Sequence, residues 1–310
     1  MNVSEWQKRL ERTFSSKGII GPRLVDIINQ ENECGNYVIN TFHGYRVLQD
    51  SFFDFFIDTL QKAGHFAREH GVPREATYYN ITLLSQLTIF RSFRAAENLL
   101  LKGYPLDGYA LLRDLKDRAI FQAAIMQGVT TFKKLHGYDI LETAKGNLSS
   151  DSELYKKAKK QQKIQEHKVL ELFLGEKAGF DKDTFDELNR WEKMFHEEVH
   201  GSRFTFAIEG GDWLRGKSPI TTGPLPNTTA IAMYLNRSNE IGWMLLRTLP
   251  VLQLKPNALG DEWSSKWHVL DDSFRYSITS FAKMGKKIGH AILKLIDSKF
   301  NFNPTYVYKE

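Results

Sequence analysis

The sequence predicts an all-α protein: a multi-helix bundle with a short N-terminal helical arm and one long irregular loop. Apolar residues recur at the three- and four-residue spacing of helices through most of the 310 residues. Glycine and proline gather between these stretches, where they end helices. Only residues 203–207 have the alternation of a short strand. We therefore expect seven or eight helices, with an arm at 1–34 and one helical domain at 35–310.

Composition places the protein among the globular proteins of the cytoplasm. Hydrophobic residues make up 42% of the chain and charged residues 25%, which can supply a large core. The formal net charge of +5 is compatible with a nucleic-acid partner. The single cysteine, Cys34, excludes an intramolecular disulfide and a multi-cysteine zinc site. No apolar run approaches the roughly 18 residues of a membrane span, and the N-terminus has no signal core, so we predict no membrane association.

Two short helices are predicted to form the arm, and a long helix follows them. Residues 3–16 form an amphipathic helix with Trp6, Leu10 and Phe14 on one side, and residues 24–30 form the second. We expect this arm to pack on the main body or on a second subunit. Residues 36–70 are apolar around much of the helix circumference, as expected of a central buried helix.

Residues 82–128 are predicted to form a central hairpin of two helices joined at 102–105, and the second helix is expected to continue to about residue 136. Gly103 ends the first helix, and Pro105 begins the second. At 100° per residue, Arg94 and Glu97 lie within the apolar face of the first helix, and Arg113 and Asp117 lie within that of the second. A charge inside an apolar face must be paired, and arginine suits bidentate contacts to oxyanions. We therefore expect either structural ion pairs or an anion site at Arg94 and Arg113.

The second half is predicted to contain four more helices and the long loop. Residues 151–174 form a lysine-rich helix whose charges face solvent or, alternatively, a nucleic acid. Residues 183–200 form an amphipathic helix. The glycine- and proline-rich residues 201–227 form the loop, whose length is typical of lids and binding loops. Residues 228–254 and 262–300 form the last two helices.

The helix at 183–200 ends in the pattern H-E-x-x-H, formed by His196, Glu197 and His200. Two histidines one turn apart can bind zinc from one helix face, while the glutamate activates water. Glu240 is the best candidate for the third ligand, because gluzincin peptidases carry theirs in an Asn-Glu context on a later helix. Glu198 inside the pattern and the lack of a preceding strand are untypical of such sites. Zinc is therefore an alternative, beside a structural role for the two histidines at the helix end.

Arg190 and His196 have the spacing R-x5-H, which resembles the R-x4–6-H motif of the HEPN superfamily. That superfamily consists of all-helical domains and includes metal-independent ribonucleases. The resemblance implies that Arg190 and His196 lie beside a scissile phosphate, generally across a homodimer interface. Trp191 stands where the motif usually has Asn, Asp or His.

A broader pattern extends over residues 80–205. Its parts are a helix that ends at Gly103, the triplet L-L-R at 111–113 with Asp117 a turn later, and V-H-G-S at 199–202 near a later helix end. This pattern resembles a family of uncharacterised bacterial all-helical proteins. The resemblance implies a helical fold and a cluster of Arg113, Asp117 and His200, and it implies no established activity.

Three functional hypotheses follow from these patterns. The first is a HEPN-like protein that binds or cleaves RNA as a homodimer, with Arg113, Asp117, Arg190, His196 and His200 as catalytic candidates. The second is a zinc-dependent hydrolase. The third is a non-catalytic helical interaction module in which the buried charges are structural.

Overall fold

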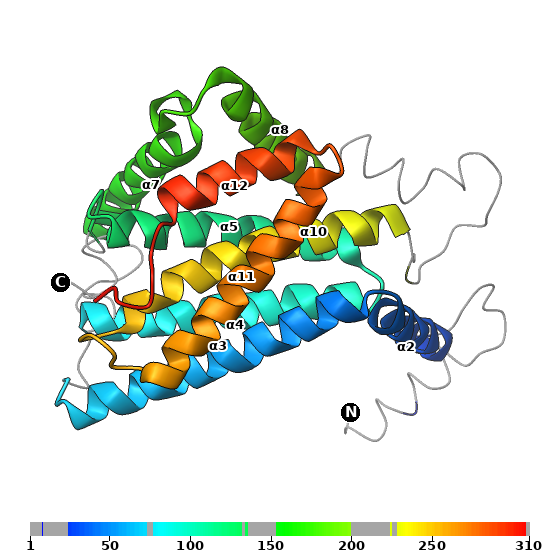
Figure 1. Cartoon of the computed structure of the whole chain (residues 1–310), viewed down its shortest axis with the longest axis horizontal. Coiled ribbons are helices and arrows are strands. Elements are labelled where there is room, and N and C mark those ends of the chain that lie inside the picture. Colours follow the sequence, from blue (N-terminus) through cyan, green and yellow to red (C-terminus); the bar gives the residue numbers. More distant parts are fainter. Residues whose placement is uncertain are drawn as a thin grey trace.

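The computed structural model describes residues 8, 24–72, 77–131, 134–135, 153–199, 224 and 228–307; for 154, 155, 158 and 197–199 it describes the backbone only. These residues form nine α-helices and two short 3-10 helices, with no strand among them. Helices α5 and α10 run through the middle (Figure 1). Helices α7, α8 and α12 lie on one side of this pair, α3 and α4 lie on the other, and α11 crosses from one side to the other. The predicted all-α bundle is confirmed.

The first two described helices are α2 (Leu24–Thr41) and α3 (His43–Glu69). The predicted gap at 31–35 is wrong, because α2 continues to Thr41 and the chain bends at Phe42, whose φ and ψ are −116° and 42°. Helix α2 therefore crosses position 34, where we placed the end of the arm, and it packs on α4 and α3. The predicted helix at 3–16 lies outside the described residues, apart from Lys8.

The central hairpin is confirmed as α4 (Tyr78–Leu101) and α5 (Pro105–Met126). The hydroxyl of Thr77 caps α4 by accepting a hydrogen bond from the Asn80 amide at 3.2 Å. Gly103 follows α4 with φ +82°, a conformation that favours glycine, and Pro105 is the first residue of α5. Helix α5 ends at Met126, about ten residues before the predicted end near 136.

The second half contains α7 (Glu153–Leu174), η1 (Glu176–Ala178), α8 (Lys182–Val199), α10 (Thr228–Thr248) and η2 (Leu249–Leu252). The predicted single helix at 262–300 is wrong. It is divided into α11 (Asp261–Lys283) and α12 (Lys287–Lys299), because Gly285 turns the chain with φ +78°. The predicted loop at 201–227 lies outside the described residues, apart from the buried Pro224.

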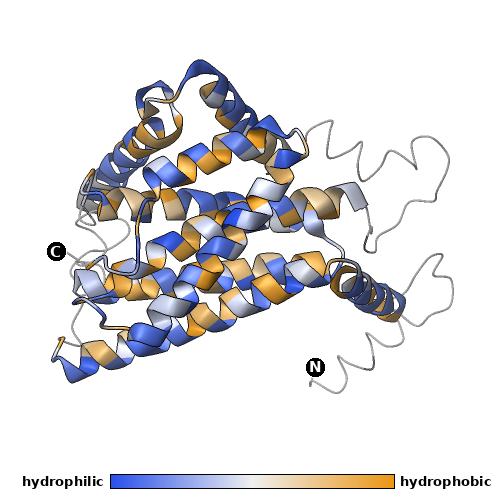
Figure 2. Ribbon diagram, viewed as in Figure 1, coloured by the Kyte–Doolittle hydropathy of each residue, from blue (hydrophilic) through white to orange (hydrophobic). Residues whose placement is uncertain are grey.

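Helix α10 is the most enclosed helix of the described part, and every residue from 237 to 248 is buried. Hydrophilic and hydrophobic residues share the helices throughout (Figure 2). Some of the polar side chains, among them Gln49, Glu97 and Arg237, are buried in the interior. No helix among the described residues has the length and hydropathy that crossing a membrane requires. The polar side chains that α10 carries into the core define the sites described next.

Candidate functional site

The buried faces of the hairpin helices agree only in part with the predicted ones. On α4 the buried residues include Phe93, Ala96 and Glu97, whereas Arg94 is half-buried with its guanidinium 5.0 Å from the Phe53 ring centre. The expectation that Arg94 faces the core is therefore wrong. The charged group that α4 places in the interior is Glu97, whose side chain is completely buried.

On α5, the buried charged residue is not one of those predicted. Arg113 and Asp117 are half-buried, and the buried cation of this helix is Lys116, which is 1% exposed. Lys116 lies 3.2 Å from Asp117 Oδ1 and is paired with Glu192 of α8. Asp117 thus belongs to a charged contact between α5 and α8. Lys116 is at the centre of this contact, and Asp117 lies at its edge.

Aromatic rings enclose the Lys116 ammonium. It lies 5.4 Å from the Trp191 ring centre and 5.5 Å from that of Phe195, and both rings are buried. Contacts of this kind stabilise a cation that has left bulk water. In the α5–α8 contact, Lys116 is therefore stabilised by the carboxylates of Asp117 and Glu192 and by two aromatic rings.

Behind this contact, α10 supplies a second buried ion pair. Arg237 donates to Glu240 Oε1 at 2.6 Å and to Oε2 at 2.5 Å, and Trp191 Nε1 donates to Oε2 at 2.7 Å. Burial is the largest single influence on the pKa of Arg237 and lowers it, but the charges and hydrogen bonds of Glu240 and Tyr109 together raise this pKa above its usual value. Burial is also the largest influence on Glu240 and raises its pKa, against the opposing effect of Arg237.

These contacts bear on the zinc hypothesis. Both oxygens of the buried Glu240 already accept hydrogen bonds from Arg237 and Trp191. His196 is exposed on α8, and His200 lies outside the described residues. Within the part of the chain that the structure describes, no three His, Cys, Asp or Glu side chains are grouped to hold a metal ion.

The two residues of the R-x5-H motif lie on the outer face of α8. Arg190 has a side chain 63% exposed and lies 3.2 Å from Glu187, while His196 is also exposed. Residues six apart are separated by 120° around a helix, and Lys193, likewise exposed, lies midway between them. Arg190, Lys193 and His196 therefore form one continuous exposed strip, which we call the α8 strip.

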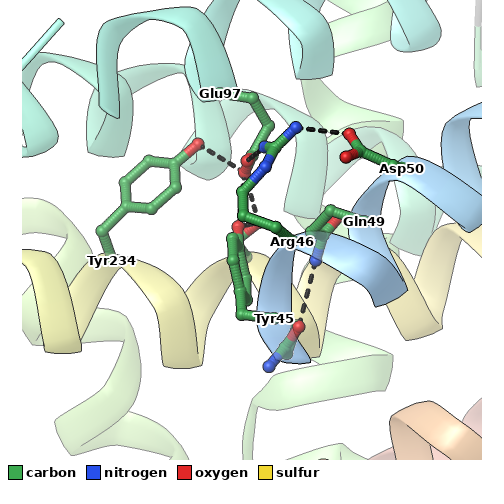
Figure 3. A network of polar contacts seen from close by, with 8 residues as sticks. Tyr45, Arg46, Gln49, Asp50, Glu97 and Tyr234 are labelled. Atoms are coloured by element: carbon green, nitrogen blue, oxygen red, sulfur yellow. Dashed lines mark hydrogen bonds and ion pairs between the residues drawn. The ribbon is translucent and has the colours of Figure 1, made fainter. Parts of the chain in front are cut away.

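The largest buried polar network is centred on Glu97 (Figure 3). The hydroxyls of Tyr45, Ser238 and Tyr234 donate to Glu97 Oε1 at 2.6, 2.8 and 3.1 Å, and Arg46 donates to Oε2 at 3.3 Å. These donors come from α3 and α10, so Glu97 ties three helices together. Arg46 also pairs with Asp50, which is half exposed and connects the network to the surface.

Burial controls the acid–base behaviour of this network. Burial is the largest influence on Glu97 and raises its pKa, while the hydrogen bonds from Tyr45 and Ser238 and the charge of Arg46 act in the opposite direction. Burial, followed by the nearby Glu97 charge, raises the pKa of Tyr45 and Tyr234 well above 10. The two phenols therefore remain hydrogen-bond donors at neutral pH.

A third buried pair joins α10 to α11. Asp271 accepts two bonds from Arg247, Nε to Oδ1 at 2.7 Å and the terminal nitrogen to Oδ2 at 2.9 Å, and Trp243 Nε1 donates to Oδ1 at 2.5 Å. The sequence contained a signal for these groups that our interpretation passed over. Three charged side chains interrupt the apolar pattern of residues 228–254, namely Arg237, Glu240 and Arg247. Of these, the prediction from sequence used only Glu240, as a zinc ligand.

The predicted site residues that the structure describes lie in several different surroundings. Asp117 lies in the α5–α8 contact, Glu240 lies in the adjacent buried pair, Arg190 and His196 lie on the α8 strip, and Arg94 lies against α3. Comparison with protein families, with curated proteins and with solved structures found no match for this chain.

Proposed function

We propose that this protein binds RNA and cleaves it without a metal ion, using the α8 strip in a HEPN-like manner. The observation that supports the proposal is that Arg190, Lys193 and His196 share one exposed sector of α8. Side chains on such a surface can contact the backbone of a nucleic acid, whereas buried side chains cannot. Arg190 is paired with Glu187, whose side chain is only 10% exposed, but the Arg190 side chain is itself 63% exposed, so its remaining N–H donors can bind a phosphate.

The chemistry assigns different roles to the two motif residues. Arg190 would neutralise the non-bridging phosphate oxygens, since arginine binds phosphate in a bidentate manner. His196 would take the proton from the attacking 2′-hydroxyl or give one to the leaving 5′-oxygen. The new P–O2′ bond forms as the P–O5′ bond breaks, so no redox partner or metal is needed.

The helix that precedes α8 in the chain, α7, carries further positive charge. Lys156, Lys157, Lys159 and Lys160 are exposed on it, and α7 and α8 are joined by the short η1 turn. Lysines on an exposed face raise the local concentration of a polyanion. Asp117 and Arg113 lie on the neighbouring helix α5. In this proposal they would not contact the RNA and would only help to hold α8 in position.

The test uses the full chain in EDTA with a labelled single-stranded RNA and the DNA of the same sequence. We expect the RNA to be cut and the DNA to survive, because only RNA has the 2′-hydroxyl. Arg190→Ala and His196→Ala should each lower the rate by at least about 100-fold. Two control variants should leave it unchanged: Arg118→Ala on α5, where the side chain is partly exposed, and His65→Ala on α3, where it is exposed.

Two results would contradict the proposal: RNA cleavage that persists in both motif variants, or wild-type protein that neither binds nor cuts RNA. The native mass of the same sample tests the homodimer that the HEPN resemblance implies.

The buried networks favour a second candidate, a non-catalytic helical interaction module. Glu97, Glu240 and Asp271 are each surrounded by donors from the chain itself, and networks satisfied in this way hold helices in position. This candidate predicts no nuclease activity at any RNA concentration. It also predicts that Arg113→Ala lowers stability, measured by urea unfolding.

A further inference from the structure

A long groove lies between α3 and α11, away from the α8 strip. Its larger part has a volume of about 770 Å³ and its smaller part about 420 Å³. Both parts are lined by Ser51, Val269 and Leu270, so they are continuous. Tyr45 and Asn239 line the larger part, which therefore borders the Glu97 network.

The walls of this groove carry apolar side chains that the described residues leave uncovered. Val47 is 52% exposed, Val269 is 66% exposed and Tyr276 is 73% exposed. Exposed apolar residues gathered along one groove are typical of a surface that another segment covers. Two helices with such side chains between them form the usual receptor for a third, amphipathic helix.

The charge of the groove is negative. Asp54 and Asp272 are exposed on its opposite walls. Lys266 is the one cation among the described lining residues, and it lies 2.6 Å from Glu262 outside the groove. A matching occupant would therefore combine an apolar stripe with cationic flanks.

The length of the groove further limits the occupant. On α3 it extends over residues 44–58, which at 1.5 Å per residue is about 21 Å. A helix of about 14 residues has the same length.

We propose that the groove binds residues 3–16 of the same chain as an amphipathic helix. This segment has 14 residues, and its apolar stripe of Trp6, Leu10 and Phe14 repeats every four residues. Residues 1–23 contain five lysines and arginines against two glutamates, which complements the acidic walls. Apart from Lys8, the segment lies outside the described residues.

The connecting chain is long enough for this arrangement. The eight residue steps from Ser16 to Leu24 span at most about 29 Å. Helix α2, with 18 residues, is about 27 Å long, and its C-terminal end adjoins the start of α3 at the Gly44 end of the groove. Phe14 would then lie near this end and Trp6 near Asp54.

Disulfide trapping in the full chain tests the proposal. Leu10→Cys is combined with Ser51→Cys at the middle of the groove, or with Leu84→Cys, a control on α4 that is 60% exposed. We expect mild oxidation to link residue 10 to residue 51 within one chain and to leave the control pair unlinked. Equal linking of both pairs, no linking, or linking between two chains only would overturn the proposal.

Charge exchange provides a second, independent test. Asp54→Lys with Asp272→Lys should slow the residue 10–51 linking by about fivefold, the effect of a few weak ion pairs. Arg9→Glu with Arg12→Glu in the same chain should restore the rate. Asp186→Lys, on the exposed face of α8, is the matched control and should change nothing. A rate that does not respond to these charges would contradict the assigned occupant.

Discussion

Replacing Asp271 by asparagine tests the buried charges most directly, because the chain offers a closely matched control. Asp271 and Arg247 have side chains 12% and 8% exposed, and they join α10 to α11. Asp297 and Arg275 form the same type of pair between α12 and α11, but both side chains are 43% exposed. The two variants Asp271→Asn and Asp297→Asn therefore remove the same charge in different surroundings.

The expected losses of unfolding free energy differ because water can solvate Arg275 after its partner is neutralised but cannot solvate the buried Arg247. Asp271→Asn leaves the Arg247 guanidinium buried without its counter-charge, which costs about 3–5 kcal/mol of unfolding free energy. In Asp297→Asn, Arg275 is solvated, and the loss is roughly 0–1 kcal/mol. Urea unfolding followed by circular dichroism measures both, and an unchanged slope with denaturant would show that the folded and unfolded states are comparable.

Equal losses in the two variants would refute the reasoning that burial makes the Asp271 pair sensitive. The double variant Arg247→Met, Asp271→Leu provides a further check. It removes both charges, so it should be more stable than Asp271→Asn, because no buried charge is left unpaired.

Three further predictions concern the turns, the acid response and the metal. Gly103→Ala should lower the thermal unfolding midpoint more than Gly128→Ala. Both glycines have positive φ, so the backbone strain is common to the two variants. A Cβ at Gly103 would lie within 3 Å of neighbouring side chains, whereas a Cβ at Gly128 would meet nothing within 4 Å. The hydrogen bond from Lys294 is the largest cause that lowers the pKa of Asp181 below 3.8, so its stabilisation is present above about pH 4 and is lost as the pH falls through the folded-state pKa. The midpoint difference between wild type and Asp181→Asn should therefore shrink in acid, and a constant difference would contradict this. Finally, because Glu240 is engaged by buried donors, elemental analysis of untagged protein should find substoichiometric zinc, whereas one zinc per chain, lost in His200→Ala, would establish the zinc alternative.

Helix ends that depend on the local chain were predictable from the sequence. Gly103 and Pro105 act through their own backbone restrictions, and the structure has them at the predicted ends of α4 and α5. The turn at Gly285 had the same kind of signal, but the apolar period continues on both sides of it and concealed the break. The bend at Phe42 lies at neither a glycine nor a proline. The helices on its two sides, α2 and α3, both pack on α4, and α3 also packs on α10 and α11.

The identity of the buried charges was decided by the tertiary structure. Helical period locates the centre of an apolar face only approximately. Residues three apart, such as Arg94 and Glu97 or Arg113 and Lys116, are therefore equally good candidates for the buried position. Neighbouring helices distinguish them, because Glu97 is held by donors about 50 and 140 residues away in the sequence, on α3 and α10. The sequence by itself determined the helical class and the hairpin, since period and backbone stereochemistry are local. Which polar groups meet inside the protein depends on contacts between distant segments, and only their packing in three dimensions establishes it.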